Sequence, residues 1–161
     1  MKEYYNKNTS IVYHDCNIDD SVIIGHHVLI RERCKISYNV RIGSYTELSH
    51  DVRVDNDVQI HSGCFISEGT VIMEKSWIGP HTKLINDDYP MTGGRHRKPL
   101  VIGKNVIVGA NCILMPGVII NSGAIIGAGS VVIKDVPAGE VWAGNPAMFI
   151  KHRKDIKEYG D

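Results

Sequence analysis

The chain has 161 residues and a mass of 17.9 kDa, which suits one domain with a substantial core. Eighteen Lys and Arg balance eighteen Asp and Glu, so we expect no overall positive field that would attract nucleic acid or an anionic membrane. No apolar run approaches a membrane span, and the start MKEYYNKNTS lacks the apolar stretch of a secretion signal, so neither is expected.

A period of six organises residues 11–84 and resumes over residues 100–136. Every sixth residue from Ile18 to Leu84, and again from Ile102 to Val132, is Ile, Leu or Val. A second column of mostly small residues lies two positions earlier. Residues two apart face the same side of a strand, so both columns line one interior. Each hexad therefore predicts a short strand and a turn, and three hexads close a coil, giving about six stacked coils.

All four cysteines, Cys16, Cys34, Cys64 and Cys112, fall in the column of small residues. Four cysteines allow three disulfide pairings. Their inward position instead favours buried, reduced thiols that fill volume in the core. Reduced thiols indicate a cytoplasmic protein.

The hexads are interrupted over residues 85–99, where the columns would require Asp88, Pro90, Gly94 and His96. Such residues cannot line an apolar core, so an excursion loop is expected to protrude here. Long loops in compact domains are either functional or disordered.

After Val132 the six-residue pattern ends. Asn145 followed by Pro146 is typical of a helix cap and first helical residue, which predicts a short C-terminal helix over residues 146–157. The expected organisation is a single all-β domain over residues 1–161, with coils at 11–84 and 100–136, the loop at 85–99 and this helix.

The hexads, the excursion and the closing run IGAGSVVIKDVPAGEVWAGNPAMFI resemble the hexapeptide-repeat acyltransferases. This resemblance, which covers about residues 11–153, implies a left-handed parallel β-helix. It also implies a homotrimer that binds acyl-coenzyme A in a groove between neighbouring subunits.

The segment FISEGTVIMEKSWIGPHTKLINDDYP is similar to the nucleotide-sugar N-acetyltransferases of that family. Their loop opens with an Asn-Asp-x-Tyr-Pro signature, which Asn86, Asp87, Tyr89 and Pro90 match; Met91 stands where the motif continues with Arg. The similarity implies transfer of an acetyl group to the amine of a UDP- or dTDP-linked amino sugar used for surface polysaccharide. Asn86, Asp87 and Tyr89 are the implied substrate-binding residues.

An amine that attacks a thioester must be unprotonated, aimed at the carbonyl and met by a donor that stabilises the oxyanion. Asn86 and Asp87 have side chains that can orient the amine, and Asp87 can accept a proton if burial raises its pKa. Alternatively, both residues simply shape the turn after Leu84, because Asn and Asp favour turns.

The resemblance assigns further residues to the cofactor. It implies that the N–H of Ala110, after Gly109, donates to the thioester carbonyl. It likewise implies that Ala128, after Gly127, contacts the pantetheine arm. Lys134 and Lys151 match positions that meet coenzyme A phosphates, although surface lysines are more commonly just solvated.

The histidines support an alternative reading. Many hexapeptide O-acetyltransferases use a His as general base, and His81, in the turn before the loop, is the better candidate here. His96 is the only loop histidine, and its RHRK setting favours a cationic, solvated ring.

We therefore expect an enzyme, an acetyl-coenzyme A-dependent N-acetyltransferase that works by direct transfer in a ternary complex, without a metal. The alternative is an O-acetyltransferase of a sugar or antibiotic hydroxyl. Two further rivals are a zinc-dependent γ-type carbonic anhydrase and a non-catalytic assembly subunit. No two histidines show the His-x₄-His spacing usual in the former.

Overall fold

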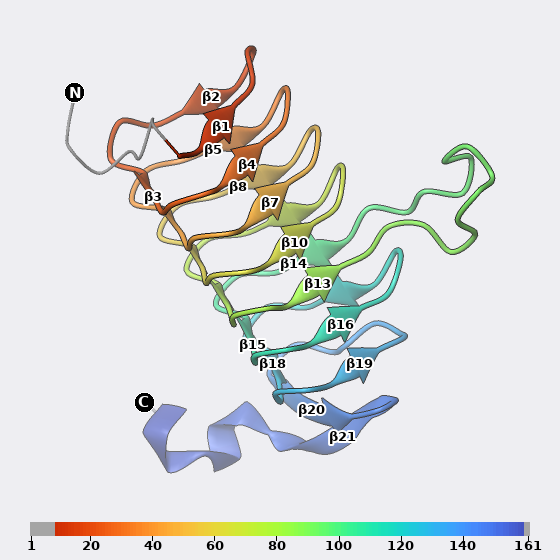
Figure 1. Cartoon of the computed structure of the whole chain (residues 1–161). Helices are drawn as coiled ribbons and strands as arrows, with labels where there is room; N and C mark the ends of the chain where they lie inside the picture. The colour runs from red at the N-terminus through yellow and green to blue at the C-terminus, as the bar shows by residue number, and fades with distance from the viewer. Residues whose placement is uncertain (1–8, 160–161) are drawn as a thin grey trace.

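Two-residue strands alternate with four-residue turns along the chain, as the computed structural model of residues 9–159 shows. The strands stack into three sheets, parallel except for the last strand, that form the sides of a prism (Figure 1). The prediction of an all-β, left-handed parallel β-helix with one protruding loop is confirmed.

Each sheet is named here after its first strand. The β1 sheet contains β1 (Ile11–Val12), β4 (Leu29–Ile30), β7 (Glu47–Leu48), β10 (Phe65–Ile66), β13 (Lys83–Leu84), β16 (Ile113–Leu114) and β19 (Val131–Val132). The β2 sheet contains β2 (Asn17–Ile18), β5 (Lys35–Ile36), β8 (Arg53–Val54), β11 (Val71–Ile72), β14 (Val101–Ile102) and β17 (Ile119–Ile120). The β3 sheet contains β3 (Ile23–Ile24), β6 (Arg41–Ile42), β9 (Gln59–Ile60), β12 (Trp77–Ile78), β15 (Ile107–Val108), β18 (Ile125–Ile126), β20 (Glu140–Gly144) and β21 (Ala147–His152).

The aliphatic column fills the prism. Ile30, Ile66, Leu84 and Ile120 are fully buried, as are most other members of the column, and they form one continuous core. The column of small residues lies at the corners, where its polar members donate to backbone carbonyls: Thr82 Oγ1 donates to the Gly109 oxygen at 2.9 Å. A small residue is needed there because a larger one would not fit beside the turn.

The cysteines behave as the pattern predicts. All four are free thiols; Cys34, Cys64 and Cys112 are buried and Cys16 is half-buried. Cys34 donates to the Ser49 carbonyl oxygen at 3.1 Å and Cys64 to that of Gly79 at 3.2 Å, so the thiols serve as the serines and threonines of the column do.

The excursion leaves the end of β13 and returns to β14 (Figure 1). Arg53 pairs with Val71, eighteen residues later, whereas Val71 pairs with Val101, thirty residues later. The excursion therefore accommodates twelve extra residues, which is two hexads, and this is why the aliphatic column resumes in phase after it.

The predicted helix over residues 146–157 is wrong. Asn145 and Pro146 form the turn of a hairpin in which β21 runs antiparallel to β20. The pairing with β20 satisfies the backbone of β21, while Met148, Phe149 and Ile150 stay about half-exposed. Only two three-residue 3₁₀ turns follow, η1 (Arg153–Asp155) and η2 (Lys157–Tyr159).

Within residues 9–159, no helix has the length and apolar character to cross a membrane.

Candidate functional site

The three corners of the prism carry different residues. We call the turns from the β3 sheet to the β1 sheet the glycine corner, because Gly25, Gly43, Gly79, Gly109 and Gly127 lie there. The turns from the β1 sheet to the β2 sheet, which include the excursion, form the excursion corner. The turns from the β2 sheet to the β3 sheet form the third corner.

At the glycine corner successive coils touch backbone to backbone. A Cβ on Gly79 would lie 2.6 Å from the Ala110 nitrogen, and one on Gly109 would lie 2.4 Å from the Ala128 nitrogen. Neither Ala110 nor Ala128 donates its N–H to an acceptor in the described part of the chain. Both amides are therefore available to a ligand that lies along this corner.

His81 lies at the same corner, two residues after Gly79. Its backbone has a left-handed φ of 61°, and its ring folds over Gly63 in the coil above, where a Cβ would come within 2.4 Å of Nδ1. Lys83 Nζ donates to the Gly63 carbonyl oxygen at 2.6 Å. His81 is exposed, and Asn111 beneath it donates its N–H to Pro80 at 2.9 Å. One chain thus places His81 and the Ala110 amide in successive coils of one corner.

Asn86 and Asp87 lie at the base of the excursion and are half-buried. Asn86 Nδ2 donates to the Glu68 carbonyl oxygen at 3.1 Å, and Asp87 Oδ1 accepts the Tyr89 N–H at 2.9 Å. Both side chains thus shape the turn, as the alternative reading expects, but the second carboxylate oxygen of Asp87 is not used by that turn.

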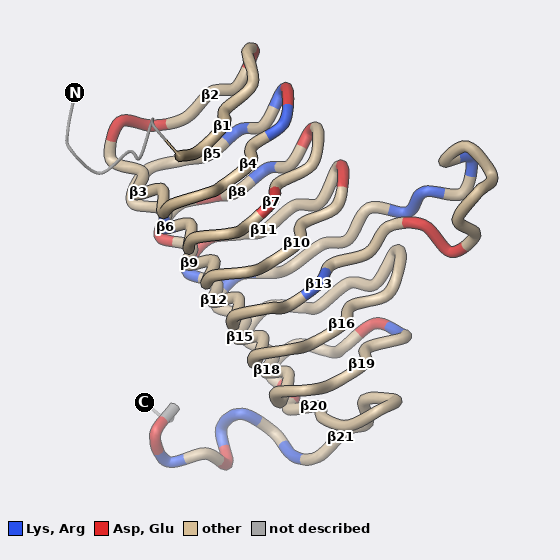
Figure 2. Tube along the Cα trace, in the orientation of Figure 1, with Lys and Arg blue, Asp and Glu red and all other residues tan. Residues whose placement is uncertain are grey.

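Charge fixes the two arms of the excursion to each other and to the prism. Acidic residues lie on the outgoing arm and basic residues on the returning arm (Figure 2). Arg97 pairs with Glu68, and Lys98 pairs with Asp88 at 2.6 Å; the hydrogen bond to Asp88 raises the pKa of Lys98.

At the tip of the excursion, Tyr89 is 62% exposed. Its ring meets that of His96, also exposed, edge to face with centroids 5.4 Å apart.

The two predicted phosphate ligands lie near the C-terminal end of the prism. Lys134 lies at the excursion corner with its Nζ 5.1 Å from the centre of the Trp142 ring, which Glu140 holds by a 2.7 Å hydrogen bond. Lys151 is an exposed residue of β21, opposite Val141.

The predicted residues therefore fall into two groups on different corners. His81, Gly109, Ala110, Gly127 and Ala128 share the glycine corner, whereas Asn86, Asp87 and Tyr89 share the excursion corner. His81 and Asn86 lie on either side of β13, so the segment between them crosses the β1 sheet from one corner to the next. One chain does not bring Asn86 to Ala110.

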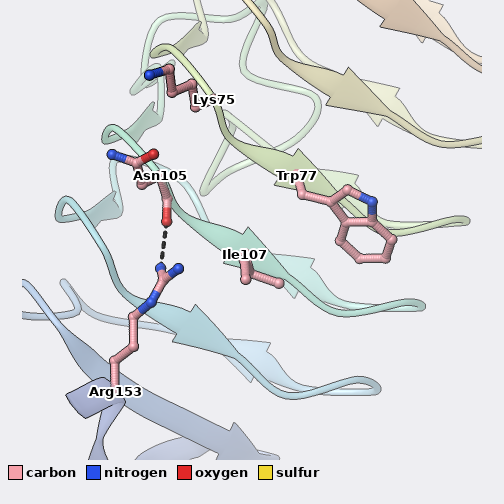
Figure 3. Close-up of a pocket in the computed structure, with 5 residues that line it drawn as sticks. All are labelled: Lys75, Trp77, Asn105, Ile107 and Arg153. Atoms are coloured by element: carbon pink, nitrogen blue, oxygen red, sulfur yellow. Dashed lines mark hydrogen bonds between the residues drawn. The ribbon is translucent and has the colours of Figure 1, made fainter. Parts of the chain in front are cut away.

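A hollow that the sequence pattern did not indicate lies on the outer face of the β3 sheet (Figure 3). It has a volume of about 320 Å³ and is lined by Lys75, Trp77, Asn105, Ile107 and Arg153. Trp77 and Ile107 are outward residues of β12 and β15, positions that a search for an inward column passes over. An aromatic residue at an outward position was the available signal.

No cluster of three or more His, Cys, Asp or Glu side chains suited to a metal ion occurs within residues 9–159.

Residues 99–134 match the family model described as bacterial transferase hexapeptide (six repeats). No curated protein matches the chain. Among solved structures, a Bacillus cereus protein provisionally assigned as an acetyltransferase is 22% identical, with a TM-score of 0.76 over 92% of this chain and 88% of that one.

Two further solved structures share the fold. A Vibrio cholerae hexapeptide-repeat acetyltransferase, solved with acetyl-coenzyme A, is 24% identical with a TM-score of 0.62, covering 80% of this chain and 72% of that one. A Clostridium difficile maltose O-acetyltransferase is 23% identical with a TM-score of 0.55, covering 84% and 68%. The predicted resemblance to hexapeptide-repeat proteins is confirmed, and these similarities establish the fold.

Proposed function

We propose that the protein is an acetyl-coenzyme A-dependent N-acetyltransferase that acts on the amino group of a UDP- or dTDP-linked amino sugar for surface polysaccharide. Two observations together carry this proposal. A column of backbone amides suited to a thioester lies at the glycine corner, and an Asn-Asp pair with the acceptor signature lies at the base of the excursion.

In the proposed reaction the Ala110 N–H polarises the thioester carbonyl and stabilises the oxyanion that forms on attack. Asn86 and Asp87 hold the sugar amine in line. The amine nitrogen forms the new C–N bond, the C–S bond breaks, and coenzyme A leaves as the thiolate. The proton lost by the amine passes to Asp87 or to water and finally to the thiolate.

The cofactor in this proposal runs along the glycine corner towards the C-terminal end of the prism. Gly109 and Gly127 allow a close approach, Ala128 offers its N–H to the pantetheine arm, and Lys151 attracts the phosphates. Lys134 lies at the excursion corner, so it reaches the phosphates only from the neighbouring copy, as Asn86 does. The acetyl-coenzyme A complex of the Vibrio cholerae protein, which shares the fold, supports this choice of donor. A cytoplasmic location follows from the free thiols and from the donor.

Two copies of the chain are needed for this site. Because Asn86 and Ala110 lie on different corners, the excursion of one copy must reach the glycine corner of the next. A closed homotrimer supplies three such contacts, since each copy offers one corner and receives one excursion.

A specific observation favours a second candidate, an O-acetyltransferase that uses His81 as general base. His81 and Ala110 lie at one corner of the same chain, in successive coils, whereas Asn86 does not. A hydroxyl acceptor needs such a base more than a sugar amine does.

The two candidates are distinguished by mass spectrometry of UDP- and dTDP-amino sugars, and of hydroxyl sugars, incubated with acetyl-coenzyme A. We expect an N-acetylated product that is lost with Asn86→Ala and kept with His81→Asn. Product only from hydroxyl acceptors, lost with His81→Asn, would instead establish the second candidate.

The role of the Ala110 amide has its own test. Pro80 occupies the corresponding position of the coil above, so this turn accommodates a proline, and Ala110→Pro replaces the N–H by a ring carbon. We expect turnover to fall by about 100-fold or more, as for loss of one oxyanion donor. Ala110→Ser keeps the N–H and is the matched control.

A further inference from the structure

The hollow on the β3 sheet has the lining of a nucleotide site. Trp77 and Ile107 are neighbours in register on β12 and β15 and form an apolar surface on its inner side. Figure 3 shows Lys75 and Asn105 along the opposite edge and Arg153 closing one end. At about 320 Å³ the hollow is at the small end of ligand sites, enough for one flat ring and its substituents.

The lining is selective in charge. Two of its five residues are cationic and none is acidic. The nearest carboxylate in sequence, Glu74, pairs with Lys104 at 2.9 Å, and Lys75 forms no ion pair with any residue of the described chain. An anion beside Lys75 therefore meets attraction without a competing carboxylate in the lining.

The aromatic wall is held in place. The Trp77 ring lies 4.6 Å from that of His61, centre to centre, at the edge away from Ile107. At the other end Arg153 Nη1 donates to the carbonyl oxygens of Asn105 at 2.7 Å and Gly123 at 3.1 Å. These contacts hold the lining in place, which lowers the cost of binding.

The hollow also lies near the proposed transfer site. Ile107 and Ala110 are three residues apart in one coil, so no more than about 11 Å separates them.

We propose that this hollow binds a nucleoside diphosphate, with the base against Trp77 and Ile107 and the diphosphate beside Lys75. The identity of the bound molecule as an acceptor rests on the proposed function. The binding of the nucleotide itself does not.

Calorimetric titration with UDP and with dTDP tests the site, with uridine and inorganic pyrophosphate as separate controls for base and phosphate. We expect one of the two nucleotides to bind. Trp77→Leu should weaken binding about tenfold or more, since one stacked base contributes that much. Lys75→Ala should also weaken binding about tenfold or more, because the diphosphate loses its cationic partner. Lys35→Ala, on the β2 sheet, is the matched control and should bind normally. Circular dichroism checks that each variant is folded.

Three results would overturn the site: pyrophosphate binding as tightly as the nucleotide, neither nucleotide binding, or equal affinity in all variants. A change of oligomeric state in Trp77→Leu would also overturn it, because the hollow would then be a subunit contact. The acetyl-transfer assay separates the two proposals. If nucleotide binding depends on Trp77 but no acetyl transfer is detected, the nucleotide site is supported and the N-acetyltransferase proposal is rejected. If transfer is detected and neither variant alters the acceptor KM, the N-acetyltransferase proposal is supported and the nucleotide site is rejected.

Discussion

At the level of single residues, close contact between coils decides which glycines are essential. Gly109 has an ordinary φ, yet a Cβ there would lie 2.4 Å from the backbone nitrogen of Ala128. Gly129 has a φ of 72°, but a Cβ there would meet nothing within 4 Å. At Gly109 a side chain is excluded by lack of space, whereas at Gly129 a side chain is disfavoured only by the left-handed backbone conformation.

We expect Gly109→Ala to lower the free energy of unfolding by about 2–3 kcal/mol, because backbone on both sides prevents relief of the clash. Gly129→Ala should cost about 1 kcal/mol, the usual cost of a left-handed alanine. Denaturant titration of both variants measures the difference. Equal losses would mean that the coils can separate at this corner, contrary to the contacts described.

The buried thiols predict a dependence of stability on pH. Burial raises the pKa of Cys34 from 9.0 to about 12 and also raises the pKa values of Cys64 and Cys112. Below pH 9 these thiols are neutral in both the folded and the unfolded chain. Between pH 9 and 12 the unfolded chain ionises Cys34 and the folded chain does not, so stability falls as the pH rises.

The free energy of unfolding should therefore decrease above pH 9 by up to about 1.4 kcal/mol per pH unit for each such thiol. Cys34→Ser is the matched control, because its hydroxyl can donate to Ser49 as the thiol does but does not ionise in this range. Its slope between pH 9 and 11 should be shallower than that of the wild type. Parallel slopes would show that Cys34 reaches solvent in the folded state.

At the level of elements, the excursion is an addition to a prism that is already complete. Its arms join where Asp87 bridges Arg97 in antiparallel fashion, and residues 88–96 contribute nothing to the core. The excursion can therefore be shortened at that bridge without breaking a coil.

Replacing residues 88–96 by Gly-Gly should leave the thermal midpoint within a few degrees of the wild type. It should raise the acceptor KM at least tenfold, since Tyr89 is lost while Asn86 and Asp87 remain. Steady-state kinetics and a thermal melt give both values. A large fall in the midpoint would mean that the excursion supports the fold, and an unchanged KM would remove Tyr89 from the acceptor site.

The elements differ in how far the sequence determines them. Hexad strands were predictable because the alternation of Ile24 or Leu84 with a small partner is a local signal repeated many times. The hairpin after residue 139 was not, because Asn145 and Pro146 suit a turn as well as a helix cap. In the folded molecule β20 pairs with β18, and its other edge is then free to pair with β21, which favours the turn over the helix cap. That strand edge does not exist in the unfolded chain.

The candidate site was predictable in part, for a related reason. Hexad counting identifies turns but does not say which turns share a corner once twelve residues are inserted between Leu84 and Val101. The separation of Asn86 from Ala110 therefore required coordinates. Trp77 was overlooked because outward positions carry no periodic signal.

At the level of the whole molecule, the separation of the two corners makes a prediction about mixed assemblies. Asn86→Ala and Ala110→Pro each disable one half of the proposed site. In a trimer that contains both variants, some sites combine an intact excursion from one copy with an intact glycine corner from another.

Refolding the two inactive variants together at equal amounts should restore about a quarter of wild-type activity, the fraction of sites that random mixing makes intact. Each variant refolded alone should stay inactive and have the same sedimentation coefficient as the mixture. No recovery from a mixture shown to contain both variants in one trimer would place both residues in a site within one chain.

The antiparallel hairpin has a consequence for the solubility of the molecule. A ladder of parallel strands exposes a row of unpaired amides and carbonyls at its end, which a second ladder can extend indefinitely into a fibre. Here β21 reverses direction along one side, and the indole of Trp142 plugs the bore beneath Lys134. The few residues that the six-residue pattern leaves out thus oppose parallel extension of the β3 sheet at this end.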